Sequence, residues 1–385
     1  MSECALRNCR AVRVTPPGGH FFFGYYDKSP WHASHRWMLA LRAGFMDRPP
    51  GPEDRADVGL IDLEKPGVFE PLASTCAWNW QQGCMLQWLD ENRVIFNDCR
   101  AGRFVAVVLN VWDRTRQELP VPIYAVSPDR RTGYRVNFSR LHTLRPGYGY
   151  AGPADPFADE PAPERDGVFR VDLQTGREEL VLSVARLARE ADPDGKYRHW
   201  VNHVQVNTEG SRFAVLHRRN QTHGRLPWTT RLMTASPDGS DARCLADYGS
   251  VSHYDWQGTH RLLAWAKWRQ PDEGYFLFDE NAPEPEQIGA GALTCDGHCS
   301  FSPDRRWVLT DTYPDGEGKR TLILYDLPAR KRLDLGRFLS PTPRQVEIRC
   351  DLHPRWRQDG RQICLDSVHE GYRGMYVLDV SDSQS

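Results

Sequence analysis

The sequence has no long apolar run and no excess of charge of either sign. No stretch of about eighteen apolar residues occurs, which is the length that a membrane-spanning helix requires. Residues 1–8, MSECALRN, lack the apolar core of a secretory signal peptide. The 49 basic and 51 acidic residues give a net charge of -2, so composition indicates neither a nucleic-acid nor an anionic-membrane partner. We therefore expect a soluble, cytoplasmic protein without either partner.

Paired cysteine motifs are also missing. The ten cysteines include no CxxC pair, and such pairs are the usual mark of zinc ribbons and redox-active disulfides. Several cysteines, such as Cys364, fall inside predicted strands, which favours reduced, buried thiols over a disulfide framework. A chain of 385 residues can bury a large core without such cross-links.

What the sequence does contain is an internal repeat. Residues 294–301, TCDGHCSF, are followed at residues 349–356 by RCDLHPRW, an offset of 55 residues. The same offset relates Cys295 to Cys350, Asp296 to Asp351, His298 to His353, Phe301 to Trp356, Asp304 to Asp359 and Asp311 to Asp366. A register held over this length indicates a repeated structural unit. Each copy has an alternating strand, a Ser-Pro-Asp or Gln-Asp-Gly turn and a second β-rich strand, and so predicts a hairpin.

Five further segments carry the same hairpin pattern. In the two copies above, we take Phe301 and Trp356 to be the last inward-facing residue before the turn. We call this position the marker. Equivalent markers occur at Trp31, Trp88, Val126, Val206 and Trp256. Such hairpins cannot bury their apolar faces alone, but units stacked around an axis can. The sequence therefore predicts an all-β, seven-bladed β-propeller that forms one domain over residues 1–385.

The two ends of the predicted ring are related. Residues 10–15, RAVRVT, alternate as a strand before the first unit, whereas the last unit lacks a fourth strand. We expect the N-terminal strand to complete the last blade and close the propeller, because an open ring would leave two free sheet edges. The alternative is a loose N-terminal arm. Residues 180–192 form the one convincing helical pattern.

Histidines share one position in the register. Three residues before the marker lie His203, His253, His298 and His353. The first strand of each blade lines the channel of a propeller, so these four imidazoles should face one cavity. Neutral imidazole is the commonest metal ligand, and histidine with carboxylate suits a transition metal such as Mn, Fe or Zn. We therefore expect a divalent metal at the channel.

Aspartates recur close to these histidines. Asp98, Asp311 and Asp366 lie ten residues after a marker, where the second strand ends beside the start of the first. They are candidates for a further ligand or for groups that orient the imidazoles. The alternative is that histidines and aspartates at repeated positions bind the turns of their own blade, a common use of Asp. Cys295 and Cys350 are out of phase with the histidines, and we expect them to be packed thiols.

The C-terminal half of the chain resembles a known enzyme group. The hairpins at 298–304, HCSFSPD, and 351–361, DLHPRWRQDGR, with GYRGMYVLDV at 371–380, are similar to those of seven-bladed propeller polysaccharide lyases. These are the oligogalacturonate lyases and, more distantly, the ulvan lyases. The N-terminal half resembles them only as a propeller.

The likeness to oligogalacturonate lyases implies a Mn ion, with Zn as the alternative. In that family three histidines and a glutamine hold the ion, which binds a uronate carboxylate. His298 and His353 match the histidines before the blade turns, Asp351 stands where a further histidine is expected, and His253 shares their register. The chain departs from the family in having no Gln-x-x-His-x-His run.

The likeness to ulvan lyases implies a different catalytic set. In that family two histidines, a tyrosine and an arginine carry the reaction. His203 and His223, followed by Tyr254 and Arg269, have a similar order and spacing, although the interval from His223 to Tyr254 is shorter.

Both likenesses imply β-elimination on a uronate. A metal or Arg neutralises the carboxylate, and a base removes the C5 proton. Lys267, Arg269 and Arg218 are basic groups at strand ends, and ordinary surface charge is their alternative reading. Aromatic rings pack on the apolar faces of sugars. The candidates for substrate contact, which could equally pack between blades, are Trp78, Trp80, the neighbouring Gln81, Tyr148 and Tyr150.

We therefore expect a lyase that cleaves uronate-containing oligosaccharides at a metal-assisted, histidine-rich site. One alternative is a glycoside hydrolase on a uronate-linked sugar, which paired carboxylates across the pocket would mark. The other is a non-catalytic propeller that binds a glycan or a protein, because fold does not dictate function. Histidines that point into the blade cores would favour this last alternative.

Overall fold

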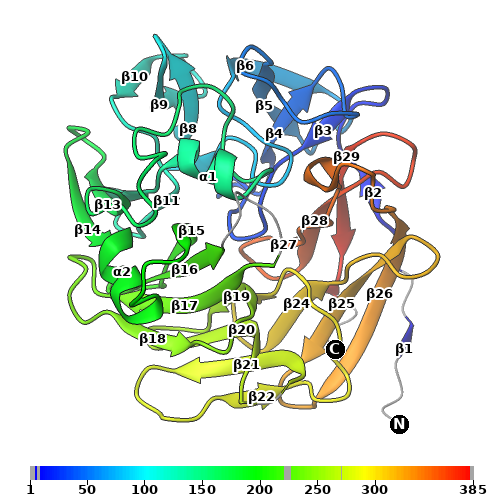
Figure 1. Cartoon of the computed structure of the whole chain (residues 1–385). Helices are drawn as coiled ribbons and strands as arrows, with labels where there is room; N and C mark the ends of the chain where they lie inside the picture. Colours follow the sequence, from blue (N-terminus) through cyan, green and yellow to red (C-terminus); the bar gives the residue numbers. More distant parts are fainter. Residues whose placement is uncertain (1–4, 7–8, 221–226, 270, 382–385) are drawn as a thin grey trace.

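The computed structural model of the chain is a ring of seven sheets around a channel (Figure 1). It describes residues 5–6, 9–220, 227–269 and 271–381. The colours of Figure 1 pass once round the ring, so each blade lies beside its sequence neighbours. The predicted seven-bladed β-propeller is confirmed. No helix in the described part of the chain is long and apolar enough to cross a membrane.

The strands of each blade are given from the channel outward. Blade one has β3 (His20–Phe22), β4 (Trp37–Ala43), β5 (Ala56–Asp62) and β6 (Phe69–Thr75). Blade two has β7 (Gln87–Trp88), β8 (Arg93–Arg100), β9 (Arg103–Asn110) and β10 (Arg116–Leu119). Blade three has β11 (Ala125–Val126), β12 (Thr132–Arg135), β13 (Gly167–Asp172) and β14 (Glu178–Ser183). Blade four has β15 (Arg198–Val206), β16 (Phe213–Asn220), β17 (Thr229–Ala235) and β18 (Arg243–Ala246).

The remaining blades follow the same order. Blade five has β19 (Val251–Trp256), β20 (Arg261–Lys267), β21 (Glu273–Asp279) and β22 (Glu286–Ile288). Blade six has β23 (Ser300–Phe301), β24 (Trp307–Asp311), β25 (Lys319–Asp326), β26 (Lys331–Leu339) and the added strand β1 (Ala5–Leu6). Blade seven has β27 (Arg355–Trp356), β28 (Gln362–Ser367), β29 (Gly374–Asp379) and β2 (Val12–Arg13).

The N-terminal strands join the last two blades. β2 lies within the predicted segment 10–15 and pairs antiparallel with β29, with Val12 opposite Val377. β1 pairs in parallel with β26, with Ala5 opposite Leu333. The outer edges of blades six and seven are therefore covered by residues from the other end of the chain.

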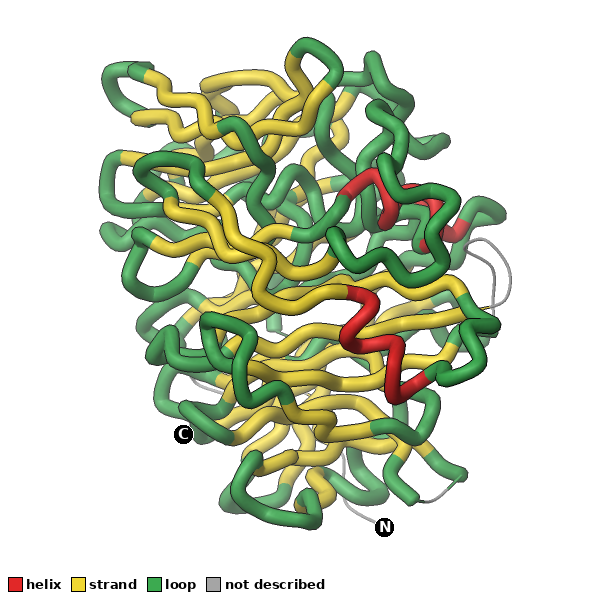
Figure 2. The backbone as a smooth tube through the Cα atoms, turned by 60° about the vertical axis from the view of Figure 1, so that its left-hand side comes forward, coloured by secondary structure: helices red, strands yellow, loops and turns green. Residues whose placement is uncertain are grey.

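Short helices lie between strands. They are α1 (Phe138–Leu144), α2 (Val184–Ala191) and the 3-10 helix η1 (Val346–Ile348). Figure 2 shows α1 and α2 on the same side of the strand layers. The helix predicted over 180–192 is shorter, because residues 178–183 form β14 and Ser183 then caps α2 by accepting the Arg186 N–H.

A shared turn joins the first two strands of several blades. In blade six the Ser302 N–H donates to the Trp307 carbonyl, and the Asp304 carboxylate accepts the Arg306 N–H. Arg305 between them has a positive φ of 62°. Blades three and seven repeat this turn, so the Ser-Pro-Asp and Gln-Asp-Gly signals fix the hairpins for a local reason.

The core lies between neighbouring blades. Trp307 and Leu309 of β24 belong to one buried cluster with Ile363 and Leu365 of β28. Val308 faces the other way and packs in the cluster of blade five. Each blade therefore depends on both neighbours to bury its two faces.

Candidate active site

Four histidines and a tyrosine meet in the channel. His203, His253, His298 and His353 are all buried. The ring centroid of Tyr25 lies 4.9, 6.4, 6.0 and 5.1 Å from those of the four histidines, in sequence order. The imidazoles of His253 and His298 are 4.1 Å apart, and those of His298 and His353 are 4.3 Å apart. The histidines therefore converge in the channel rather than pointing into the blade cores.

Irregular backbone turns these side chains inward. The pairing of β15 with β16 skips residues 203–204, and that of β19 with β20 skips residues 252–253. His203 and His353 have positive φ values of 60° and 42°. Met85, at the same register position in blade two, has a φ of 56°. Bulges and left-handed residues re-aim side chains at sites of this kind.

The segment that carries Tyr25 is held by blade seven. Asp366 of β28 accepts the N–H groups of Phe23 and Gly24, at 3.2 and 3.5 Å. Arg355 forms a 3.0 Å ion pair with Asp366 and donates to the Tyr25 carbonyl. Asp366 of blade seven thus binds backbone that follows β3 of blade one and an arginine of its own blade, so it holds neighbouring blades together rather than a turn of its own blade.

His203 and Tyr254 lie deeper, and neither lines the cavity described below. The Tyr26 hydroxyl donates to the Tyr254 carbonyl at 2.9 Å and lies 3.4 Å from His203 Nε2. The Tyr254 hydroxyl donates to the His203 carbonyl, and the two rings stack at 4.3 Å. Burial holds the pKa of His203 well below its ordinary value. These two predicted catalytic residues are held in place by neighbours.

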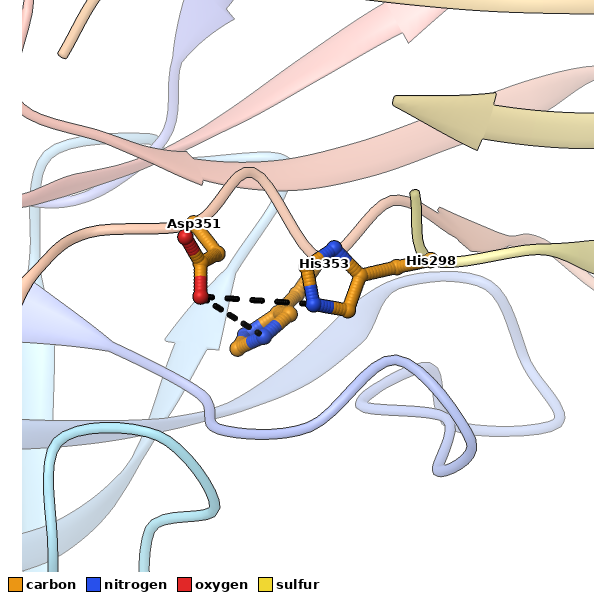
Figure 3. Close-up of side chains that lie close together, drawn as sticks. All are labelled: His298, Asp351 and His353. Atoms are coloured by element: carbon orange, nitrogen blue, oxygen red, sulfur yellow. Dashed lines mark ion pairs between the residues drawn. The ribbon is translucent and has the colours of Figure 1, made fainter. Parts of the chain in front are cut away.

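His298, Asp351 and His353 form a candidate metal-binding group (Figure 3). Their ligand atoms lie within 4.8 Å of one another. Asp351 Oδ2 is 4.0 Å from His298 Nε2 and 3.8 Å from His353 Nε2. Both Nε2 atoms are buried and have no hydrogen-bond partner in the described residues. Two free imidazole nitrogens and a carboxylate oxygen are donors that fit a divalent transition metal.

Asp311 orients His298 within this group. Its carboxylate accepts the His298 backbone N–H at 2.7 Å and lies 2.8 Å from Nδ1. A proton on Nδ1 leaves the Nε2 lone pair free to bind an ion. Burial alone would raise the pKa of Asp311, but His298 holds it below its ordinary value. A Cβ on Gly297 would lie 1.8 Å from the Asp311 carbonyl oxygen, so this close approach requires glycine.

Two arginines hold Asp351. Arg320 Nη1 lies 2.8 Å from Oδ1, and Arg349 Nε lies 2.8 Å from Oδ2. Burial alone would raise the pKa of Asp351, but Arg349 and Arg320 hold it far below its ordinary range. The carboxylate is therefore ionised, and an ion bound here would share it with two guanidinium groups.

A cavity of about 270 Å³ opens beside the histidines. Its charged walls are Arg145, Arg218, Glu273 and Asp296, and His253 is the one channel histidine that lines it. His298, Asp351 and His353 do not reach the cavity surface. They lie behind Tyr25 and His253, the latter packed against His298.

Two guanidinium groups on the cavity wall have no acidic partner in the described chain. The Nε atoms of Arg145 and Arg218 are buried and unbonded. Arg145 lies over the rings of Tyr148 and Trp228, at 4.2 and 4.5 Å. Burial and the neighbouring Arg145 lower the pKa of Arg218 to about 10, so Arg218 stays cationic at neutral pH. This wall fits an anion such as a carboxylate.

His253 is oriented for proton transfer. Its Nδ1 lies 2.9 Å from Asp296 Oδ1, which favours a proton on Nδ1 and leaves Nε2 unprotonated. Burial lowers the pKa of His253 although Asp296 opposes the shift. A neutral imidazole with an orienting carboxylate is the arrangement expected of a general base.

Several residues predicted to contact substrate lie outside the cavity. Trp78 and Trp80 are buried and donate to the Asp54 and Arg48 carbonyls. The Gln81 amide donates to the Arg349 carbonyl, and the buried Tyr150 hydroxyl accepts from Asn97. These positions correspond to packing at the rim, the alternative for this set. Arg218 and Tyr148 do line the cavity.

The predicted basic residues of blade five are also not among those that line the cavity. Lys267 ends β20, and Arg269 is exposed and forms a 2.6 Å ion pair with Glu284. His223 lies outside the described residues. Of the predicted catalytic set, the described chain brings His203 and Tyr254 into contact and places Lys267 and Arg269 outside the cavity wall.

Sequence reasoning missed Lys28, Arg145, Arg320 and Arg349. Lys28 did have a signal, because it stands three residues before the Trp31 marker, and it is buried 5.1 Å over the Tyr124 ring. Arg145 lies between α1 and β13, outside the repeated hairpins, so the register gave no signal for it. Arg349 stands two residues before Asp351 in the same segment, whereas Arg320 comes from β25, which only the fold brings to Asp351.

The arrangement of the whole chain matches solved structures. An oligogalacturonate lyase in complex with manganese superposes with a TM-score of 0.70 and 16% identity, over 97% of this chain and 94% of that one. The chain has the fold of the oligogalacturonate lyases. A second oligogalacturonate lyase, from Vibrio parahaemolyticus, superposes with a TM-score of 0.67 and 14% identity, over 100% of both chains. The tricorn protease superposes with a TM-score of 0.54 and 10% identity, over 95% of this chain and 34% of that one.

Comparisons of the sequence alone give no match. No protein-family model matches the chain, and no curated protein does. A structural match at such low sequence identity shows only that the fold is shared, so we argue the function from the site. The likeness to ulvan lyases and the cytoplasmic location stay predictions.

Proposed function

We propose that the protein is a lyase that cleaves uronate-containing oligosaccharides by β-elimination. One observation carries this: an oriented, neutral histidine, His253, shares a cavity with two unpaired arginines, Arg145 and Arg218. The matching fold of two oligogalacturonate lyases, one a manganese complex, supports the proposal. The partner is then an acidic oligosaccharide.

The arginines act on the substrate carboxylate. Arg145 and Arg218 bind the uronate carboxylate of the residue in the cavity and neutralise its charge. Removal of the C5 proton places negative charge on this carboxylate, so the same contacts strengthen in the transition state. Tyr148 and Trp228 hold Arg145 in position through their rings.

His253 removes the proton. Its Nε2 accepts the C5 proton while Asp296 stabilises the imidazolium through Nδ1. The C4–O bond breaks as the C4–C5 double bond forms, and the leaving oxygen takes a proton from solvent. His253 was predicted as a metal ligand, but its place on the cavity wall favours the role of base.

His298, Asp351 and His353 would hold a divalent ion, with Asp311 fixing His298. Because these three residues lie behind the cavity wall, the bound ion would add positive charge near the cavity without contacting the substrate carboxylate. We propose Mn first and Zn as the alternative, because two nitrogen donors and one oxygen suit both.

The test is product formation by three variants. Purified protein with added Mn or Zn is incubated with uronate oligomers, and the unsaturated product is followed by its ultraviolet absorbance. We expect His253→Ala to lower kcat by about 10²- to 10⁴-fold. Arg218→Gln should lower kcat/KM, whereas Arg100→Gln, an exposed arginine on blade two, should match the wild type. Absence of unsaturated product from every uronate oligomer would rule out the lyase.

Hydrolysis is the second candidate, because the cavity contains two carboxylates. Asp296 and Glu273 both line it, and a hydrolase needs such a pair. Asp296 is bound to His253, and Glu273 accepts from Ser250 and Trp265. New reducing ends without the ultraviolet signal would identify this reaction.

A further inference from the structure

An aromatic ledge adjoins the cavity on blade five. Tyr248 directly precedes Gly249, where a stretch of cavity wall begins, and Trp268 follows β20, whose Trp265 also lines the cavity. Arg269 and Glu284 complete the group. We call Tyr248, Trp268, Arg269 and Glu284 the blade-five ledge.

The ledge is held rigidly by its own contacts. The Tyr248 and Trp268 rings meet edge to face with centroids 5.0 Å apart. The Arg269 guanidinium lies 5.2 Å over the Trp268 ring and donates to the Tyr248 hydroxyl. Trp268 Nε1 donates to Glu284, which pairs with Arg269. A ligand that meets rings fixed in advance loses little extra entropy on binding.

Exposed aromatic rings concentrate at this cavity. Three large aromatic side chains are strongly exposed in the described chain: Trp112, Tyr248 and Tyr313. Tyr313 lines the cavity, and Tyr248, 42% exposed, adjoins it. A fixed ring with an apolar face and hydrogen-bonding groups at its rim suits the face of a sugar.

The size of the cavity requires that the substrate extend beyond it. Pockets for drug-sized ligands have about 300–1,000 Å³, whereas this cavity has about 270 Å³. It therefore accommodates roughly the sugar that reacts and part of its neighbour, and a longer chain must cross the mouth.

We propose that the blade-five ledge binds the sugar residues of the substrate that lie beyond the cleaved linkage and its two flanking sugars. The identity of the ligand rests on the proposed lyase function. Because Arg269 is already paired with Glu284, the ledge contributes ring stacking rather than a further charged contact. Substrates of three or more sugars gain from it, and dimers do not.

The test compares uronate dimers, trimers and tetramers on the full-length protein. We expect the wild type to show a higher kcat/KM for trimer than for dimer. Tyr248→Ala should lower kcat/KM for trimer and tetramer by about 3- to 10-fold and leave the dimer unchanged. Tyr248→Phe should retain the preference because it keeps the ring. Trp112→Ala, which removes an equally exposed aromatic on blade two, is the matched control.

Binding measured by saturation-transfer NMR separates the two proposals. If no uronate is cleaved, yet trimer binds more tightly than dimer and Tyr248→Ala abolishes that difference, the lyase function fails and the ledge stands. If the dimer is cleaved but the trimer has no advantage in binding or turnover, the ledge is refuted and the lyase stands. Equal losses on dimer and trimer in Tyr248→Ala would also refute the ledge.

Discussion

Asp311 and Asp366 occupy the same position in blades six and seven, yet their contacts differ. Asp311 binds Nδ1 and the backbone N–H of His298. Asp366 binds the backbone of Phe23 and Gly24 instead. The repeat therefore determines where a side chain points, and its neighbours determine what it binds.

This pair provides a matched test of the metal site. By calorimetric titration with Mn or Zn, Asp311→Ala should weaken binding by about 10- to 100-fold, because His298 loses the group that orients it. Asp366→Ala should keep the wild-type affinity wherever the variant remains folded. The double variant His298→Ala with His353→Ala should bind no ion.

Two results would contradict this assignment. One is an unchanged ion content in the double-histidine variant, determined by elemental analysis of folded protein. The other is an equal loss of affinity in both aspartate variants, which would indicate a general effect of destabilisation.

At the scale of elements, the Tyr25–Tyr26 segment shows how a loop fills the channel. Gly24 has a φ of +132°, and a Cβ there would lie 2.8 Å from the backbone of Gln82. The segment thus depends on blade seven through Asp366 and on the loop before blade two through Gly24.

We expect Gly24→Ala to lower the free energy of unfolding by about 2 kcal/mol or more, because the new methyl group meets backbone that cannot move aside. Gly44→Ala is the control, since a Cβ there meets no atom within 4 Å. Urea denaturation measures both. Equal stability of the two variants would show that the segment adapts freely.

The hairpins were predictable because each is specified locally. The turn at Ser302–Arg306 and the marker residues recur at fixed intervals, so register alone located the channel histidines. The cavity walls were less accessible to such reasoning. Arg145 reaches the cavity from a loop that lies outside the repeat, and the indole groups of Trp78 and Trp80 bind backbone carbonyls that only the fold brings near.

At the scale of the whole molecule, a buried chain of polar groups links α2 to blade four. Asp192 lies 3.1 Å from His199 Nε2, and His199 Nδ1 lies 2.9 Å from His217 Nε2. His217 Nδ1 is buried without a partner in the described residues. A second proton, on Nδ1, would give the ring a positive charge that neither water nor a described hydrogen-bond partner stabilises. Burial therefore holds the pKa of His217 well below its ordinary value.

This chain predicts acid sensitivity of the folded state. The unfolded His217 takes up a proton below about pH 6.5 while the folded one stays neutral, so stability is intact above that pH and falls below it. We expect His217 to contribute at most about 1.4 kcal/mol per pH unit to the slope of the unfolding free energy against pH. His217→Gln should remove this contribution, whereas His35→Gln, the control near the surface, should leave the slope unchanged. Chemical denaturation between pH 7 and pH 5 compares them, and identical slopes in all three proteins would refute the role of His217.

The pairing of β2 with β29 has a consequence for synthesis on the ribosome. β2 is made before any strand of the seven hairpins but must wait for β29, and the segment that carries Tyr25 must wait for Asp366. Early blades can stack as they emerge, but blade seven and the channel centre take form only when the C-terminal hairpins are released. A nascent chain that stalls late therefore exposes a nearly finished ring with open sheet edges to chaperones and proteases.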